Sequence, residues 1–210
     1  DPIMKLAEKN KFFVVEDCAQ AHGAHYKGLS VGSIGHIGAW SFCHDKIMTT
    51  GGEGGMVTTN NEVFWRRMWA FKDHGKSLDA VERSKKSPSY EFDWLHESFG
   101  TNGRMTELQA AIGRVQLKRM TEWHSARKRN ANKILNVCEQ FLEALHVPRV
   151  PDLLEHAYYK CYVYVRPGGL KKEWSRDRII EKIIDCGVSC YYGSCSEVYL
   201  EKAFDDTGFR

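Results

Sequence analysis

Four polar residues in the first quarter of the chain could carry chemistry together: Asp17, Gln20, Ser41 and Lys46. A lysine amine that is partly neutral attacks carbonyl carbons, and burial beside a cationic group produces the neutral form. A carboxylate keeps a pyridine nitrogen protonated, and hydroxyl and backbone N–H groups bind phosphate. Pyridoxal phosphate needs such a set. An aspartate and a lysine at this separation occur in most proteins, so spacing alone also leaves Lys46 open as ordinary surface charge.

The segments around these residues predict strands. Residues 11–17, KFFVVED, form an apolar run before two acids, which predicts a strand of a parallel sheet covered on both faces. Asp17 then lies at the carboxyl edge of the sheet, where open α/β sheets bind ligands. Residues 39–42 and 55–59 predict two further strands, one on each side of Lys46.

The next part of the chain predicts a helix and a loop. Asn60 or Asn61 can cap a helix over residues 62–74, which Gly75 ends. Residues 76–103 are polar and predict an exposed loop, whose length indicates a functional role or mobility.

The second half predicts a change of domain. Residues 104–120 have apolar positions at helical spacing, and a second helical stretch reaches about Leu145. Residues 147–151, VPRVP, predict a linker because prolines stop helices. The elements expected beyond it are a strand over 158–165, a helix that Ser175 caps and a strand over 188–192. We therefore predict one α/β domain over residues 1–146 and a small C-terminal α/β domain over residues 147–210.

Composition narrows the class of protein. The chain has 210 residues, of which 42% are hydrophobic, as in folded globular proteins. Its net charge of +3 comes from interspersed acids and bases, which argues against nucleic-acid binding. No apolar run is long enough to span a membrane. The first residues lack the order of a signal peptide and predict the end of a helix that leads into a strand, which indicates a piece of a longer reading frame.

The cysteines predict free thiols rather than a metal site. The chain has seven cysteines and no C-x-x-C pair. Cys186, Cys190 and Cys195 crowd together, but zinc there needs a fourth ligand and closer pairing. We therefore expect no metal and a reducing, cytoplasmic location.

Two blocks resemble the DegT/DnrJ/EryC1/StrS family of sugar aminotransferases, which have fold type I of the pyridoxal-phosphate enzymes. The first block is VEDCAQAHGAHYKGLSVGSIGHIGAWSFCHDKIMTTGGEGGMVTTN, and the second is GTNGRMTELQAAIGRVQL. The resemblance implies a mixed, mostly parallel sheet with helices on both faces. It also implies that residues 1–146 are part of the large cofactor-binding domain, whose N-terminal part lies outside this sequence, and that residues 147–210 are part of the small domain.

The resemblance implies a role for five residues. Lys46 would bind pyridoxal phosphate covalently and move the proton, and Asp17 would pair with the pyridine nitrogen. Gln20 would lie against the cofactor ring, and Ser41 would hold the phosphate. Asn102 would reach the phosphate of a neighbouring subunit's cofactor, since family members are homodimers with shared active sites. Gly103 departs from the family pattern, in which many relatives have an aromatic residue next to this asparagine.

The implied reaction is transamination of a nucleotide-linked keto sugar, with glutamate as the amino donor. Relatives that act as dehydratases have a histidine at the position of Lys46, so the lysine favours amino transfer. A sugar dehydratase with the same cofactor and a catalytically inactive regulatory relative stay open as alternatives. The sequence assigns no role to His22, Glu53 or Arg104.

Overall fold

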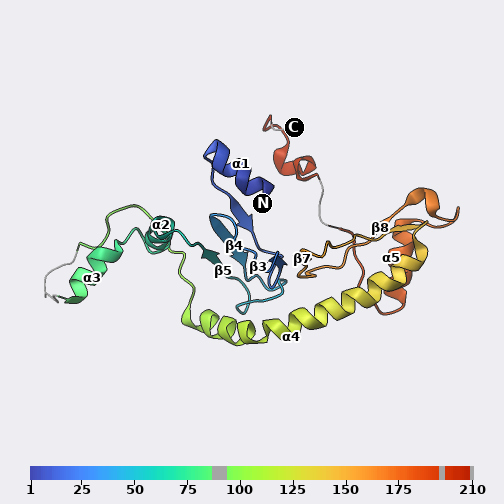
Figure 1. Cartoon of the computed structure of the whole chain (residues 1–210), viewed down its shortest axis with the longest axis horizontal. Helices are drawn as coiled ribbons and strands as arrows, with labels where there is room; N and C mark the ends of the chain where they lie inside the picture. Colours follow the sequence, from blue (N-terminus) through green and yellow to red (C-terminus); the bar gives the residue numbers. More distant parts are fainter. Residues whose placement is uncertain (87–93, 194–196, 209–210) are drawn as a thin grey trace. The chain divides into compact units, whose positions relative to one another are not determined.

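The protein is described by a computed structural model that covers residues 1–86, 94–193 and 197–208 (Figure 1). The chain divides into two compact units. The first contains Asp1–Asn132 and Val150–Lys160, and the second contains Lys133–Arg149 and Cys161–Arg210. Pro88 and Cys195 lie outside the described residues. The domain division at residues 146 and 147 stays a prediction.

The main sheet of the first unit has the strand order β1-β4-β5. Its strands are β1 (Val15–Asp17), β4 (Ile37–Ser41) and β5 (Gly55–Thr58). β1 runs parallel to β4 with Asp17 opposite Ala39, and β5 runs antiparallel to β4 with Gly55 opposite Ser41. The predicted strands are therefore confirmed, as part of a mixed sheet. Because β1 and β4 are parallel, Asp17 and Ser41 end their strands at the same edge.

A second small sheet flanks the glycine-rich residues between β1 and β4. It has the order β3-β2-β7, with β2 (His25–Tyr26), β3 (Leu29–Ser30) and β7 (Leu154–Glu155). The Glu16 carboxylate holds the glycine-rich segment between β1 and β4 in place, since its two oxygens accept hydrogen bonds from three backbone N–H groups. The donors are Gly32 at 2.8 Å, Ile34 at 2.9 Å and Gly35 at 2.6 Å.

Glu16→Ala is expected to lower the free energy of unfolding by about 2–4 kcal/mol, because it removes an ionised acceptor from three backbone donors. Denaturant unfolding measures the loss. Glu16→Gln keeps the side-chain length and one acceptor oxygen, so it is expected to cost less. Equal stability of the alanine variant and the unchanged protein would contradict the structural role of Glu16.

The helices of the first unit correct one sequence-based expectation. They are α1 (Pro2–Asn10), α2 (Glu62–Lys72), α3 (Leu78–Lys86) and most of α4 (Glu107–Cys138). The Asn61 side chain caps α2 by accepting from Phe64 N, as the sequence predicts. The expected loop over residues 76–103 is wrong in part, because it contains α3. The Ser77 hydroxyl accepts from Ala80 N, and basic residues occupy the last turn of α3, where they complement the helix dipole.

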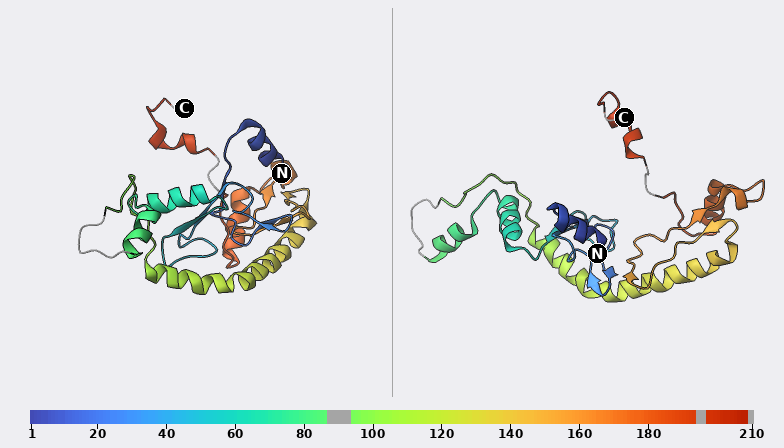
Figure 2. Two further views of the ribbon diagram at one scale, coloured as in Figure 1. Left: turned by 60° about the vertical axis from the view of Figure 1, so that its left-hand side comes forward. Right: turned by 45° about the horizontal axis from the view of Figure 1, so that its top comes forward.

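α4 also differs from expectation. One unbroken helix of 32 residues replaces the two predicted helical stretches (Figure 2). It ends at Cys138, and a 3₁₀ turn, η1 (Glu139–Phe141), follows.

The described residues of the second unit contain the end of α4, a short antiparallel pair and a further helix. β6 (Leu145–His146) pairs with β8 (Tyr164–Val165), and the Ser175 hydroxyl caps α5 (Arg176–Asp185) as predicted. The 3₁₀ turns are η2 (Pro167–Gly169), η3 (Val198–Leu200) and η4 (Lys202–Phe204). The strand predicted over 158–165 shrinks to β8, and the strand predicted over 188–192 is wrong, because those residues join no sheet. A strand needs a partner for its backbone groups, and an apolar run does not reveal one.

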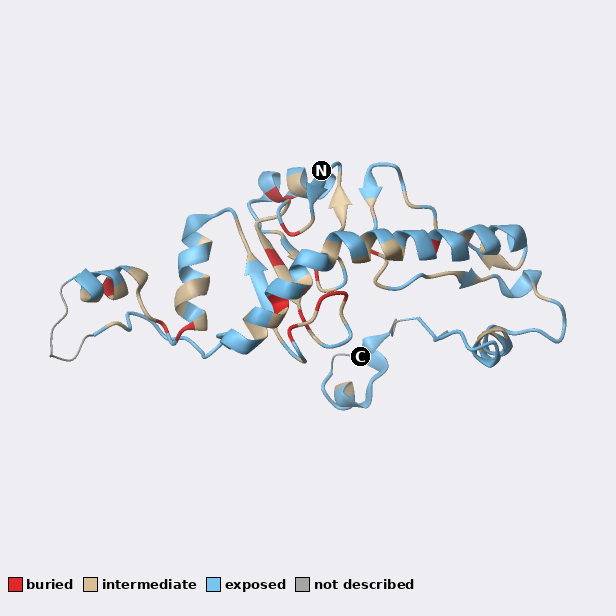
Figure 3. Cartoon of the chain, turned by 90° about the horizontal axis from the view of Figure 1, so that it is seen from below, coloured by how far each residue is buried: buried red, intermediate tan, exposed pale blue. Residues whose placement is uncertain are grey.

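Burial is concentrated in the loop that follows β4 (Figure 3). Its buried members are Phe42, Ile47, Met48 and Thr50. By contrast, Phe13 and Val15 are 67% and 60% exposed. The sequence predicts that other elements cover both faces of the strand over residues 11–17, but in the described chain they do not. Among the residues that the structure describes, no helix is long and apolar enough to cross a membrane.

Candidate active site

The Lys46 loop is the segment from Phe42 to Gly54, and it closes on itself. Phe42 N donates to Gly54 O at 2.8 Å, and Thr50 N donates back to Phe42 O at 3.2 Å. Within the loop, Lys46 N donates to Cys43 O at 3.0 Å and forms a turn. The Lys46 side chain is only 16% exposed. The strand pair therefore holds this amine in a fixed, half-buried position, unlike a surface lysine.

α4 braces the Lys46 loop from outside. Thr50 is 1% exposed, and a Cβ on Gly113 of α4 would lie 2.9 Å from its methyl group. Gln116 accepts from Thr49 N at 3.0 Å, and the Gln109 amide donates to Glu53 O at 2.7 Å. The second sequence block thus supports the loop of the first, which explains physically why the two blocks occur together.

Asp45 and Tyr159 surround the Lys46 amine, and the sequence indicated neither. Lys46 Nζ lies 3.6 Å from Asp45 Oδ1 and 5.2 Å from the centre of the Tyr159 ring. The Tyr159 hydroxyl donates to Asp45 Oδ2 at 2.7 Å. This hydrogen bond and, to a smaller extent, the Lys46 charge lower the pKa of the Asp45 carboxyl. Asp45 is next to Lys46 in the sequence, and this adjacency was the signal that could have indicated it. Tyr159 lies beyond the C-terminal end of α4 in the sequence.

Asp17 lies where the sequence predicts, at the end of β1, and Ser41 ends β4 one residue before the predicted end of that strand. Asp17 Oδ1 accepts from Ala19 N at 3.1 Å, which orients the carboxylate just beyond β1. Ser41 Oγ accepts from Cys43 N at 3.4 Å, at the start of the Lys46 loop. Gln20 follows β1 and is exposed. The structure therefore assigns Asp17, Ser41 and the Lys46 loop to one sheet edge.

Asn102 belongs to a different cluster. It forms a backbone bridge with Asp73, and its side-chain oxygen accepts from Arg104 Nε at 3.0 Å. Arg104 also pairs with Asp73 at 3.3 Å. Burial acts to raise the pKa of Asp73, but the charges of Lys76 and Arg104 outweigh it and lower that pKa. Arg104 therefore orients Asn102, and the reach of Asn102 into a partner's site stays a prediction.

His22 lies beneath the Lys46 loop. It is 4% exposed, and its ring packs against Trp40 and Phe42 with centroid distances of 5.3 and 5.9 Å. Burial lowers the pKa of His22 below its ordinary value of 6.5; the Ser41 backbone opposes this effect and the Lys46 charge adds to it. His22 therefore packs against the start of the Lys46 loop, in surroundings that disfavour the charged form of its ring.

This burial predicts a pH dependence of stability. Below about pH 6.5 the unfolded chain takes up a proton that folded His22 resists, so the free energy of unfolding falls as pH falls, by at most about 1.4 kcal/mol per pH unit for one group. Urea unfolding between about pH 7.5 and 5.5 measures the slope. His22→Gln is expected to reduce it. Burial also lowers the pKa of His156, so a residual slope is expected. An unchanged slope in the variant would contradict the assignment.

The donor set fits pyridoxal phosphate. A half-buried amine, a carboxylate at a strand end and a hydroxyl at the neighbouring strand end are the groups that this cofactor requires. Lys46, Asp17 and Ser41 would hold it from one sheet edge, where α/β sheets bind ligands.

Comparison with known proteins identifies the family of the chain. The model of the DegT/DnrJ/EryC1/StrS aminotransferase family matches residues 1–208. GDP-perosamine synthase of Escherichia coli O157:H7 is 32% identical over 222 residues, which cover 100% of this chain and 54% of that protein. L-glutamine:2-deoxy-scyllo-inosose aminotransferase of Streptomyces lividus is 39% identical over 131 residues, covering 62% of this chain and 30% of that protein.

Solved structures agree as well. The aminotransferase from Psychrobacter cryohalolentis is 62% identical with a TM-score of 0.94, and the match covers 99% of this chain and 54% of that chain. S. venezuelae DesV is 25% identical with a TM-score of 0.78, covering 96% and 48%. The chain spans about half the length of the curated relatives it matches. The resemblance and the fold class are confirmed: the chain belongs to the DegT/DnrJ/EryC1/StrS aminotransferase family.

Proposed function

We propose that this chain carries the lysine-bearing half of a pyridoxal-phosphate-dependent sugar aminotransferase. The observation that carries the proposal is the half-buried Lys46 amine, held by a closed loop at the sheet edge where Asp17 and Ser41 end their strands. A regulatory relative without catalysis would not need this arrangement. The aminotransferase names of the relatives support the same conclusion.

Each of the site residues of this chain would have a different role in the reaction. Pyridoxal phosphate, when bound, supplies an electron sink that stabilises negative charge on a substrate carbon. Lys46 would hold the cofactor between turnovers and move a proton at the substrate carbon as base and then as acid. Asp17 would keep the proton on the ring nitrogen, and Ser41 would bind the phosphate. Gln20 would lie against the ring.

The names of the relatives support a class of substrate. GDP-perosamine synthase and dTDP-3-amino-3,4,6-trideoxy-alpha-D-glucose transaminase carry nucleotides in their names, which favours a nucleotide-linked keto sugar. We propose glutamate as the donor. The scyllo-inosose relatives name L-glutamine, so glutamine is the second candidate. The proposed assembly is a homodimer in which Asn102 reaches the partner's site, and the proposed location is the cytoplasm, whose reducing conditions suit free thiols.

One assay tests the proposal. The protein is loaded with pyridoxal phosphate and given glutamate or glutamine, with and without a nucleotide-linked keto sugar. Without acceptor, about one oxo-acid per site is expected, and continuous release is expected with acceptor, as in ping-pong kinetics. A sugar that loses oxygen without gaining nitrogen would make the protein a dehydratase. No release with either donor would contradict amino transfer.

A further inference from the structure

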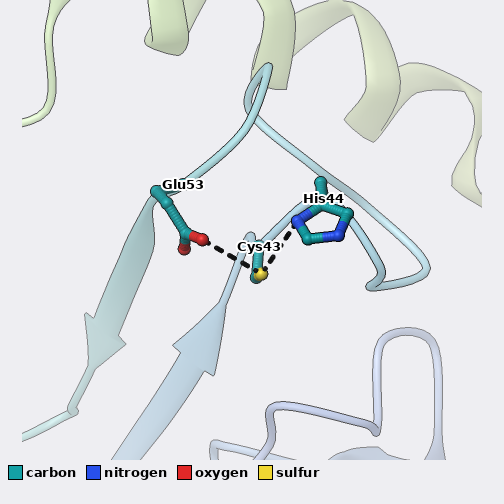
Figure 4. Close-up of side chains that lie close together, drawn as sticks. All are labelled: Cys43, His44 and Glu53. Carbon is teal, nitrogen blue, oxygen red and sulfur yellow. Dashed lines mark hydrogen bonds between the residues drawn. The ribbon is translucent and has the colours of Figure 1, made fainter.

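Three side chains with metal-binding atoms meet at the two ends of the Lys46 loop. Cys43 and His44 open the loop after β4, and Glu53 closes it before β5 (Figure 4). Cys43 Sγ lies 3.5 Å from His44 Nδ1 and 3.3 Å from Glu53 Oε1. All three atoms lie within 4.8 Å of one another. The Cys43 thiol donates to the Glu53 carboxylate.

The two separations from Cys43 Sγ match the edges of a tetrahedral metal site. Zinc binds sulfur at about 2.3 Å, and histidine nitrogen or carboxylate oxygen at about 2.0–2.2 Å. With tetrahedral angles, those bond lengths place the sulfur about 3.5 Å from the nitrogen and from the oxygen. The two measured distances from Cys43 Sγ agree within a few tenths of an ångström. A cation could therefore enter with small side-chain rotations.

The backbone around the three residues is already fixed. Cys43 forms a bridge with Gly52, which brings the two ends of the loop together. The Glu53 carbonyl accepts from the Thr50 hydroxyl at 3.0 Å and from the Gln109 amide at 2.7 Å. The Glu53 carboxylate takes no part in those loop contacts. His44 and Glu53 are exposed and Cys43 is half-buried, so an ion in solution can reach all three.

We propose that Cys43 Sγ, His44 Nδ1 and Glu53 Oε1 bind a divalent cation of intermediate softness, Zn²⁺, with water as the fourth ligand. On binding, the thiol releases its proton to solvent, and the thiolate and carboxylate together balance the charge of the ion. Sulfur and imidazole select zinc over Mg²⁺ and Ca²⁺, which prefer oxygen. The three ligands are not among the residues proposed to hold pyridoxal phosphate. The proposal differs from the sequence-based expectation of no metal.

Occupancy has a consequence for Lys46. Two ligands come from the start of its loop and one from the end, so the ion cross-links the segment that carries the amine. Slower amide hydrogen exchange in residues 43–53 is therefore expected on addition of Zn²⁺.

Metal titration tests the site directly. The protein, freed of cofactor and chelator, carries serine at Cys186, Cys190 and Cys195 so that those thiols do not compete. One equivalent of Co²⁺ is expected to give the intense visible bands of tetrahedral coordination and a thiolate-to-cobalt charge-transfer band, and Zn²⁺ is expected to displace it. Cys43→Ser is expected to remove the charge-transfer band. Glu53→Gln, which keeps the backbone contacts of Glu53, is expected to weaken Zn²⁺ binding by at least about tenfold.

Cys161→Ser is the matched control, because it removes an exposed thiol in the other unit. It is expected to leave the spectrum and the affinity unchanged. Thermal unfolding without metal checks that each variant is folded. Equal Zn²⁺ affinity in the unchanged protein and in Glu53→Gln, or a thiolate band that survives in a folded Cys43→Ser variant, would overturn the proposal. So would absence of the cobalt bands from the protein that retains Cys43.

Discussion

Replacing Lys46 by alanine is expected to abolish the visible absorption of lysine-bound pyridoxal phosphate and to lower kcat/KM by at least about 10³-fold. The reason is that one amine performs two tasks, covalent retention of the cofactor and proton transfer at the substrate carbon. The Lys46 loop also leaves the Lys46 side chain only 16% exposed, with its amine beside Asp45 and Tyr159, where a neighbouring lysine cannot replace it without a backbone change. Absorption spectra and steady-state kinetics on the same preparation measure both effects.

A matched control separates these effects from the loss of a positive charge. Lys118 is an exposed lysine on α4, and Lys118→Ala is expected to keep both the absorption band and the rate. Lys46→Arg keeps the charge but not the nucleophile, so it is expected to behave like the alanine variant. An unchanged absorption band in Lys46→Ala would show that another lysine binds the cofactor, and the proposed site would then be wrong.

The strands that carry the site could be predicted, because their signals are local. The apolar run before Asp17 and the run over residues 39–42 indicate the two strands, and the parallel pairing of β1 with β4 places Asp17 and Ser41 at one edge. Successive side chains of a strand point to opposite faces. Glu16 and Asp17 are adjacent acids with different surroundings for this reason: Glu16 faces the glycine-rich segment, and Asp17 turns to Ala19. The sequence shows two acids but not which one is structural.

The features that were missed depend on contacts between distant segments. Tyr159 reaches Asp45 across 114 positions of sequence, and no motif predicts such a contact. Glu53 meets Cys43 only because the Lys46 loop closes. α3 was missed for a different reason, since it has nine residues of which only Leu78, Ala80 and Val81 are apolar, too few to show a helical period in a polar stretch. Its cap and its ion pair with α2 stabilise it instead.

Asp17→Asn is expected to lower kcat by about 10²–10³-fold while the lysine-bound absorption band persists, because an amide no longer holds the proton on the ring nitrogen by charge. The substitution is nearly isosteric, and the asparagine oxygen can still accept from Ala19 N, as Asp17 Oδ1 does at 3.1 Å. The free energy of unfolding is therefore expected to change by less than about 0.5 kcal/mol. Steady-state kinetics, absorption spectra and denaturant unfolding measure the three quantities.

The neighbouring acid makes this test decisive. Glu16→Gln and Asp17→Asn each remove one negative charge, from adjacent positions of the same strand. If the rate depended only on the total negative charge at this end of the strand, both variants would slow the reaction alike. The structure predicts a crossed pattern instead: the Glu16 variant loses stability, since Glu16 binds three backbone donors, and keeps kcat per folded molecule. The Asp17 variant keeps stability and loses kcat. An Asp17→Asn enzyme with full kcat would refute the pairing of Asp17 with the cofactor ring, whatever the result at Lys46.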